Sequence, residues 1–254
     1  MIRALLFALG LMALPAQAGE EIVSGLSQNR VAITANFDGS EILIYGAVKR
    51  DSPAPEDLGR MEVIVTVEGP STPLVIRRKA KVAGIWLNRD SVTIDAAPSF
   101  YAVATTGNLD EILSGTEDLR YSITLPQVIR AVGISAEASH PQEFVDSLQR
   151  LRLQEDRYRI AERSVQFLEE TLFRADVVLP ANLTEGNYNV RIFLTRGGKV
   201  VDSSAAIIGV RKAGLERFLF RAAHDQPAAY GVAALVLAGL AGWIASFIFR
   251  FIRS

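Results

Sequence analysis

The distribution of hydrophobic and polar positions divides the chain into two apolar ends and a long mixed middle. At the N-terminus, Met1 and Arg3 precede an uncharged apolar run over residues 4–14, and the small-residue motif Ala16-Gln17-Ala18 follows closely. This order is typical of a cleavable secretory signal peptide. The run is shorter than the roughly 20 residues that a membrane-spanning helix needs, which argues against the alternative of an uncleaved anchor. We therefore predict a signal peptide over residues 1–18.

The C-terminal end holds a longer apolar run. Residues 228–249 contain no charged side chain, and the run is long enough to cross a bilayer as a helix. A buried helix of a soluble protein, the alternative, would normally show a polar stripe. Flanking positive charges are more numerous before the span than after it, so the orientation rests on the signal peptide. We expect a single-pass protein of the bacterial inner membrane, with most of the chain in the periplasm and residues 250–254 as a cytoplasmic tail.

Small residues recur along one side of this span. Ala234, Ala238, Gly242 and Ser246 are spaced four residues apart, which places them on one helical face. Such a stripe lets a second helix approach closely, and it predicts docking of a membrane partner or self-association. The alternative is that the stripe reflects the general abundance of Ala and Gly in membrane helices.

Residues 212–227, just before the span, have apolar positions at helical spacing with charged residues between them. The pattern predicts an amphipathic juxtamembrane helix, which either lies on the membrane surface or packs against the folded domain. Pro227 separates this segment from the span.

The region over residues 19–106 shows β-strand patterns. Apolar-rich runs at residues 31–37 and 41–48 are joined by Asp38-Gly39, which predicts a hairpin because glycine accepts the positive φ of a tight turn. Residues 61–68 alternate as in a half-buried strand. Further strand-like runs follow at residues 74–82, 84–87, 91–94 and 100–104. Short strands at this spacing are typical of a β-sandwich.

Residues 107–163 change character and predict a helical insert. Ser139 and Gln142 match a capping box that opens a helix, and a less regular helix is expected over residues 110–133. The apolar face of the capped helix is expected to hold Phe144, Leu148, Leu151 and Tyr158. Its other face carries mixed charges, which indicates a solvated surface, with a partner-binding ridge as the alternative.

Strand patterns return over residues 164–211. The runs at residues 188–195 and 199–210 are joined by Arg196-Gly197-Gly198 and predict a second hairpin. We therefore expect a mainly β fold: an Ig-like or β-sandwich-type ectodomain with a helical insert and one C-terminal transmembrane helix. One β-rich domain interrupted by helices and two small β units both fit this pattern.

Composition narrows the chemistry that this domain can perform. The formal net charge of −1 lacks the basic excess expected of a nucleic-acid-binding protein. There is no cysteine, and the two histidines, His140 and His224, are far apart, which excludes thiolate chemistry and a multi-histidine metal site. Glu117 and Asp118 stand at a predicted helix start, where capping accounts for two neighbouring carboxylates without a catalytic role. With no nucleotide-binding or hydrolase motif either, we expect no catalytic residue, metal, cofactor or nucleic acid, and no enzymatic activity.

The most distinctive local feature of the middle region is a basic run followed by a tryptophan. Arg77, Lys79 and Lys81 share one face of a strand because side chains alternate with period two, and Trp86 follows closely. Cations in a row repel one another, so this face is a candidate for binding an anion, a lipid headgroup or an acidic patch on a partner protein. The alternative is that the cations protect an exposed sheet edge against aggregation.

Three blocks carry a resemblance to a known family. They are Gly25-Leu26-Ser27-Gln28-Asn29-Arg30-Val31-Ala32-Ile33 with its continuation through Tyr45-Gly46-Ala47-Val48, then Val82-Ala83-Gly84-Ile85-Trp86-Leu87-Asn88, and finally Arg221-Ala222-Ala223-His224 leading to Tyr230-Gly231. On these blocks the chain resembles a family of alphaproteobacterial transmembrane proteins that is defined by sequence and has no established activity. The resemblance covers essentially the whole mature chain. It implies a membrane protein of a family whose members tend to be encoded beside a permease of the sulfite-exporter type, and it supplies no catalytic residues.

These observations support three functional hypotheses. The first is a membrane-anchored periplasmic accessory or binding module that acts with an inner-membrane partner, for which a transporter of the sulfite-exporter type is the candidate. The second is a periplasmic enzyme or enzyme subunit acting on envelope material, which would show a deep pocket lined by converging carboxylates. The third is a structural envelope protein, which would show neither a pocket nor a stable partner.

Overall fold

The computed structural model describes residues 20–34, 37–50, 59–130, 141–169, 171–212 and 223–252. It confirms a mainly β protein with few helices and one long C-terminal apolar helix. The predicted signal peptide, Ser139 of the capping box and most of the juxtamembrane segment lie outside the described residues.

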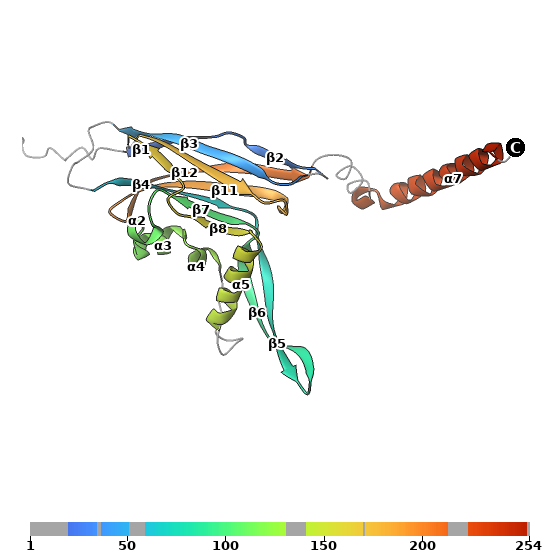
Figure 1. The fold of residues 1–254 in the computed structure, drawn as a ribbon, viewed down its shortest axis with the longest axis horizontal. Coiled ribbons are helices and arrows are strands. Elements are labelled where there is room, and N and C mark those ends of the chain that lie inside the picture. The colour runs from blue at the N-terminus through green and yellow to red at the C-terminus, as the bar shows by residue number, and fades with distance from the viewer. Residues whose placement is uncertain are drawn as a thin grey trace, which may run out of the picture.

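Two sheets form the body of the protein (Figure 1). Sheet A has the strand order β1-β3-β10-β9 and consists of β1 (Glu20–Leu26), β3 (Ser40–Arg50), β10 (Leu172–Leu179) and β9 (Gln166–Leu168). Sheet B has the order β2-β12-β11-β4-β7-β8 and consists of β2 (Arg30–Ile33), β12 (Lys199–Lys212), β11 (Gly186–Arg196), β4 (Met61–Glu68), β7 (Tyr101–Thr105) and β8 (Tyr158–Ala161). Both sheets combine strands from before and after the helices, so the two β-rich regions form a single unit.

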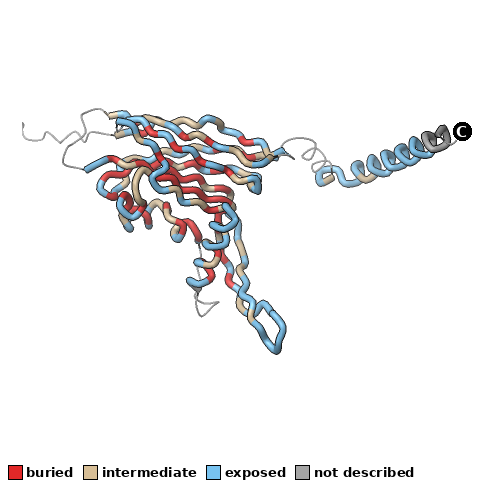
Figure 2. The backbone as a smooth tube through the Cα atoms, in the orientation of Figure 1, coloured by how far each residue is buried: buried red, intermediate tan, exposed pale blue. Residues whose placement is uncertain are grey.

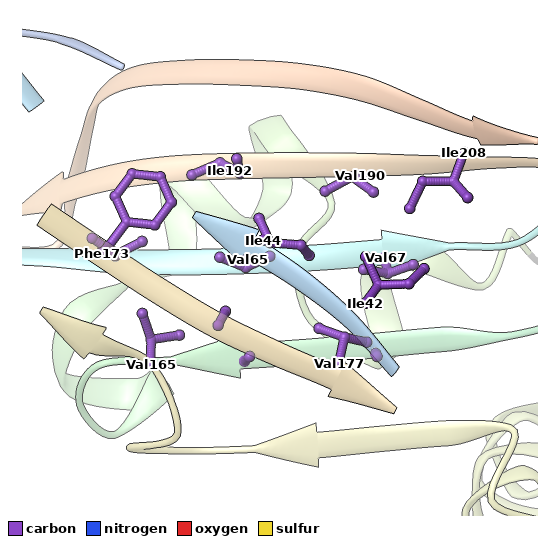
Figure 3. Close-up of a cluster of buried hydrophobic side chains, with 14 of the residues drawn as sticks. Ile42, Ile44, Val65, Val67, Val165, Phe173, Val177, Val190, Ile192 and Ile208 are labelled. Carbon is purple, nitrogen blue, oxygen red and sulfur yellow. The ribbon is translucent and has the colours of Figure 1, made fainter. Parts of the chain in front are cut away.

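The main core lies between the two sheets, which pack face to face. Alternate residues of each strand point inward, as the period-two geometry of a strand requires. The buried side chains from sheet A include Ile42, Ile44, Phe173 and Val177, and those from sheet B include Val65, Val67, Val190, Ile192 and Ile208 (Figure 3). This regular apolar alternation is the signal that makes most of these strands predictable from sequence.

Short helices cover the other face of sheet B. They are α2 (Leu109–Ile112), α3 (Gly115–Tyr121), α4 (Leu125–Val128) and α5 (Pro141–Gln154). A second core forms between them and the sheet, from residues such as Ile64 and Phe193 of the sheet and Ile123 and Leu148 of the covering segments (Figure 2). Strand β4 is therefore buried on both faces, whereas its alternating pattern predicts a half-buried strand.

The predicted hairpin around Asp38-Gly39 is wrong. β2 pairs in parallel with β12 in sheet B, whereas β3 pairs with β1 and β10 in sheet A. Gly39 does adopt a positive φ of 122°, and a Cβ there would lie 2.8 Å from the carbonyl oxygen of Leu179. The turn signal is therefore genuine, but it marks a passage between sheets and not a return within one. By contrast, β11 and β12 do form the predicted hairpin across Gly197-Gly198.

The helical insert differs from its prediction in two places. Where one longer helix is predicted over residues 110–133, the described part of that range holds the short helices α2, α3 and α4. Tyr158 lies on strand β8, parallel to β7, and not on the face of α5, while Leu151 is about half exposed. The chain turns at Asp156, whose φ of 55° is incompatible with continuing the helix.

The C-terminal helix α7 covers Pro227–Ile252. Pro227 is its first residue, a position where proline is favoured because the missing N–H would have no helical partner. Its segment Pro227–Ser246 has a mean hydropathy of 1.9 and none of it is buried by the rest of the protein, as a single membrane span requires.

Candidate functional site

A long hairpin projects from the body of the protein and carries the basic run. It consists of β5 (Ser71–Val82) and β6 (Ile85–Pro98), which pair only with each other among the described strands; we call it the arm (Figure 1). The turn at Ala83-Gly84 has positive φ at both residues, 51° and 90°, which is the backbone that a two-residue hairpin loop needs. β6 is a single strand where the sequence predicts two short runs, because the polar stretch at residues 88–90 continues the pairing across a bulge near Arg78.

The inner half of the arm is fixed to the helical layer. Val92 and Ile94 are fully buried in the second core. Arg78 donates hydrogen bonds to Asp90, the shorter at 2.7 Å, and to Glu143 of α5 at 3.1 Å. Its guanidinium also lies 5.3 Å from the ring centre of Phe144. The hydrogen bond to Asp90 raises the pKa of Arg78, which stays cationic. These contacts hold the arm at its base and leave its outer half without packing from the helices.

One face of the arm presents the predicted site residues together. Lys81 lies directly across from Trp86, and Lys79 across from Asn88, so these side chains share one face of the hairpin with Arg77. Trp86 is 65% exposed. The strand register thus places Trp86 on the face that the cations are predicted to share.

The opposite face of the arm tip is apolar. Val82 pairs with Ile85, and Ala80 pairs with Leu87. Ile85 is 64% exposed, and Val82 and Leu87 are 44% and 50% exposed; the tip is drawn as exposed in Figure 2. The tip therefore combines exposed aliphatic side chains with an aromatic ring and lysines, although it contributes nothing to either core.

The predicted stripe on α7 is presented on an accessible helix. Ala234, Ala238, Gly242 and Ser246 all lie on α7 and are exposed. A Cβ added at Gly242 would meet no atom within 4 Å. The bulky residues of the helix, such as Trp243, are exposed as well, so nothing within the described chain covers the stripe.

An apolar row crosses the outer face of sheet A, and sequence reasoning missed it. Val23, Ala47, Leu172 and Leu168 are paired in turn across β1, β3, β10 and β9, so all four point away from the main core. Val23, Leu172 and Leu168 are 55%, 54% and 62% exposed. A depression of about 530 Å³ lies along this row, where Tyr45 also lines it. Recognising the row needs the strand pairing, because outward positions on separate strands look isolated in the sequence.

The acidic residues of the insert serve the fold. Asp118 Oδ1 accepts hydrogen bonds from the backbone N–H groups of Ile123 and Thr124, at 3.0 and 2.8 Å, which fixes the chain after α3. Glu117 forms an ion pair with Arg120 at 3.3 Å. Among the described residues, no group of three His, Cys, Asp or Glu side chains is placed to hold a metal ion.

These features define a membrane-anchored β protein: a two-sheet body with a projecting arm, followed by one apolar helix. Residues 21–251 match the family described as "Putative transmembrane protein (Alph_Pro_TM)", and the chain belongs to this family. The search of curated proteins gives no match.

Among solved structures, the sporulation control protein Spo0M from Bacillus subtilis is similar at 12% identity and a TM-score of 0.31. The alignment covers 82% of this chain and 55% of that protein, so this chain spans just over half of Spo0M. A likeness at this level carries no argument about function.

Proposed function

We propose that the protein is a membrane-anchored periplasmic binding module, without catalytic activity, that acts with an inner-membrane protein. The observation that carries this proposal is the apolar row Val23–Ala47–Leu172–Leu168 on sheet A. An antiparallel sheet with one solvated face normally alternates apolar and polar residues, so its outer face should be polar. A contiguous exposed apolar surface is characteristic of a site that another protein covers.

Anchoring by α7 favours a partner in the same membrane. A tethered domain meets a membrane neighbour at high effective concentration, so a modest contact surface is sufficient for association. The stripe of α7 would supply a second contact within the bilayer. The permease of the sulfite-exporter type that the family resemblance implies is the first partner to test.

The test is co-purification of the tagged protein with this permease from native membranes. Leu172→Glu places a charge in the middle of the row, where the exposed position tolerates it in the free protein. We expect at least a tenfold lower recovery of the permease, since a charge buried in an interface typically costs more than about 1.4 kcal/mol. Val178→Glu is the matched control, because Val178 lies on the same strand and face but outside the row, next to Glu41.

The proposal is wrong if the unsubstituted protein purifies alone. It is also wrong if Leu172→Glu and Val178→Glu retain the permease equally well while both remain folded by circular dichroism.

A further inference from the structure

The geometry points to a second membrane contact: the tip of the arm docks on the anionic lipid surface of the membrane that α7 spans. The tip would enter end-on, so that Lys79, Lys81 and Trp86 on one face meet the headgroups while Ile85 and its apolar neighbours on the opposite face contact the acyl chains. This inference requires only membrane anchoring and does not depend on the proposed permease partner.

The chemistry of the tip matches a lipid interface. Residues 79–89 contain Lys79, Lys81 and Arg89 and no acidic residue. Within the described part of the chain, these three cations form no ion pair, whereas Arg78 behind them is neutralised by Asp90 and Glu143. Basic side chains are attracted to anionic headgroups, and tryptophan prefers the interface between headgroups and acyl chains.

The exposed aliphatic side chains favour a lipid surface over a free anion. A phosphate or other small anion would account for the lysines but not for Val82, Ile85 and Leu87, which stay largely in contact with solvent. A two-stranded hairpin is only marginally stable by itself and has no core in which to bury apolar side chains. Positions such as 82, 85 and 87 at its tip would therefore normally be polar. Insertion into the outer part of a bilayer buries them.

The position of the arm also fits this role. The arm leaves the body at the end of sheet B from which the chain continues toward α7 (Figure 1). Pro70, next to the start of β5, lies against Gly186, and Gly186 is paired with Val210 near the end of β12. The same end carries a hollow of about 660 Å³ whose lining includes Arg30, Arg211 and Lys212.

The lengths are compatible as well. β5 runs from Ser71 to Val82, which gives the arm a length of about 35–40 Å at roughly 3.3 Å per residue. Ten residues, 213–222, separate Lys212 from the helical turn at 223–225, and a chain of that length spans at most about 35 Å. The tip can therefore reach the surface of the bilayer that holds α7.

Fluorescence of Trp86 tests the inference directly. The chain has two tryptophans, so Trp243→Phe leaves Trp86 as the only reporter in the full-length protein. The protein is reconstituted without any partner into vesicles with brominated acyl chains. One set contains phosphatidylcholine alone, and the other contains phosphatidylcholine and phosphatidylglycerol in equal amounts. Both leaflets have the same composition, so the direction of insertion does not affect the result.

We expect quenching and a blue shift of Trp86 emission in the anionic vesicles and much less in the zwitterionic ones. Lys79→Ser with Lys81→Ser should lower the docking equilibrium constant by about 25-fold, since each basic residue at an anionic surface contributes roughly a fivefold factor. Lys199→Ser, at the turn between β11 and β12, is the matched control and should leave quenching unchanged. In the protein that keeps Lys79 and Lys81, high salt should also reduce the quenching, because salt screens the attraction between the lysines and the anionic lipids.

Unquenched Trp86 in anionic vesicles would overturn the inference. So would quenching that is equal in both lipid compositions and insensitive to salt. If the double serine variant aggregates, Lys79 and Lys81 protect a strand edge in the unsubstituted protein. The salt titration of the protein that keeps both lysines then decides whether they also bind the lipid surface. Loss of the permease from this variant in native membranes, combined with unquenched Trp86 in vesicles, would assign the arm to a protein partner and leave the proposed accessory function standing.

Discussion

Buried tyrosines tie sheet B to the segments that cover it. The Tyr158 hydroxyl donates a hydrogen bond to the carbonyl of Pro98 at 3.0 Å, and that of Tyr101 donates to the carbonyl of Ile123 at 2.7 Å. The two rings meet edge to face, with centroids 6.5 Å apart. Burial raises the pKa of Tyr101, and it raises that of Tyr158 to about 12.

Tyr158 should make the fold sensitive to alkali. The folded state holds the phenolic proton more tightly than the unfolded chain, where tyrosine titrates near about pH 10. The stability from this group is therefore fully present below about pH 10 and is lost between about pH 10 and pH 12. We expect Tyr158→Phe to lower the free energy of unfolding by about 1 kcal/mol near neutral pH, through the lost hydrogen bond.

Denaturant titrations of both proteins at about pH 8 and pH 11 provide the measurement. Tyr158→Phe should reduce the alkaline loss of stability by about 1 kcal/mol relative to the unsubstituted protein. An identical loss in the two proteins would show that Tyr158 does not contribute to it.

A buried ion-pair cluster stands at the first described residue. The Glu20 carboxylate accepts hydrogen bonds from Arg50 at 3.1 Å and from Arg196 at 2.7 Å, and Glu20 and Arg196 are almost completely buried. The cluster joins β1 and β3 of sheet A to β11 of sheet B. Removing one charge from such a group leaves its partner buried and uncompensated.

Glu20→Gln should therefore destabilise the protein by about 3 kcal/mol in thermal or chemical unfolding. The neighbouring Glu21→Gln is the control, since its pair with Lys49 is largely exposed, and it should change stability by less than about 0.5 kcal/mol. Equal effects of the two substitutions would contradict a special role for the buried cluster.

Elements with a strong alternation could be predicted closely from the sequence. β4 begins and ends at the predicted residues 61 and 68, because valines alternate along it and Gly69-Pro70 follows. The shared face of Arg77, Lys79 and Lys81 also follows from period two alone. The length of β6 does not, because its polar middle breaks the apolar pattern while the hairpin pairing continues.

The apolar row on sheet A could not be found in this way. It needs β1, which the sequence pattern does not single out, and it needs the pairing of four strands from distant parts of the chain. Local patterns show which residues of one strand share a face, but they do not show which strands are neighbours.

The stripe of α7 gives a prediction for the membrane-spanning element. Gly242→Leu should abolish self-association or permease co-purification, because a large side chain prevents close approach of a second helix. Gly239→Leu is a matched control: a Cβ at either glycine meets no atom within 4 Å, but Gly239 lies off the stripe. Crosslinking in native membranes, followed by size analysis of the products, shows whether each variant still associates with itself or with the permease. Equal behaviour of both variants would mean that the stripe is only compositional.

For the whole molecule, both hydrophobic cores are built without α7. The residues that form them come from the two sheets, the short helices and the base of the arm. A chain ending at Lys212 should therefore fold without the membrane helix. We expect it to appear in the soluble fraction with a β-type circular dichroism spectrum and a cooperative thermal transition. Recovery only as an insoluble or unfolded product would show that the helix is needed for folding.

The topology of the whole molecule is the part that sequence patterns leave open. The turn signal at Asp38-Gly39 predicts neighbours in one sheet, yet β2 and β3 lie in different sheets. The partner of β2, which is β12, and one of the two partners of β3, which is β10, come from more than 100 residues further along the chain. Pairing at such distances depends on how the assembled layers pack.

The placement of β12 determines how the protein responds to mechanical force. Among the described strands it is the last before the membrane helix, and it lies between β2, to which it is parallel, and β11, to which it is antiparallel. A pull at Lys212 along the strand would act at right angles to its hydrogen bonds with β11. Under such a pull those bonds would break together in shear. The strand that leads to the anchor would then resist being peeled from the sheet.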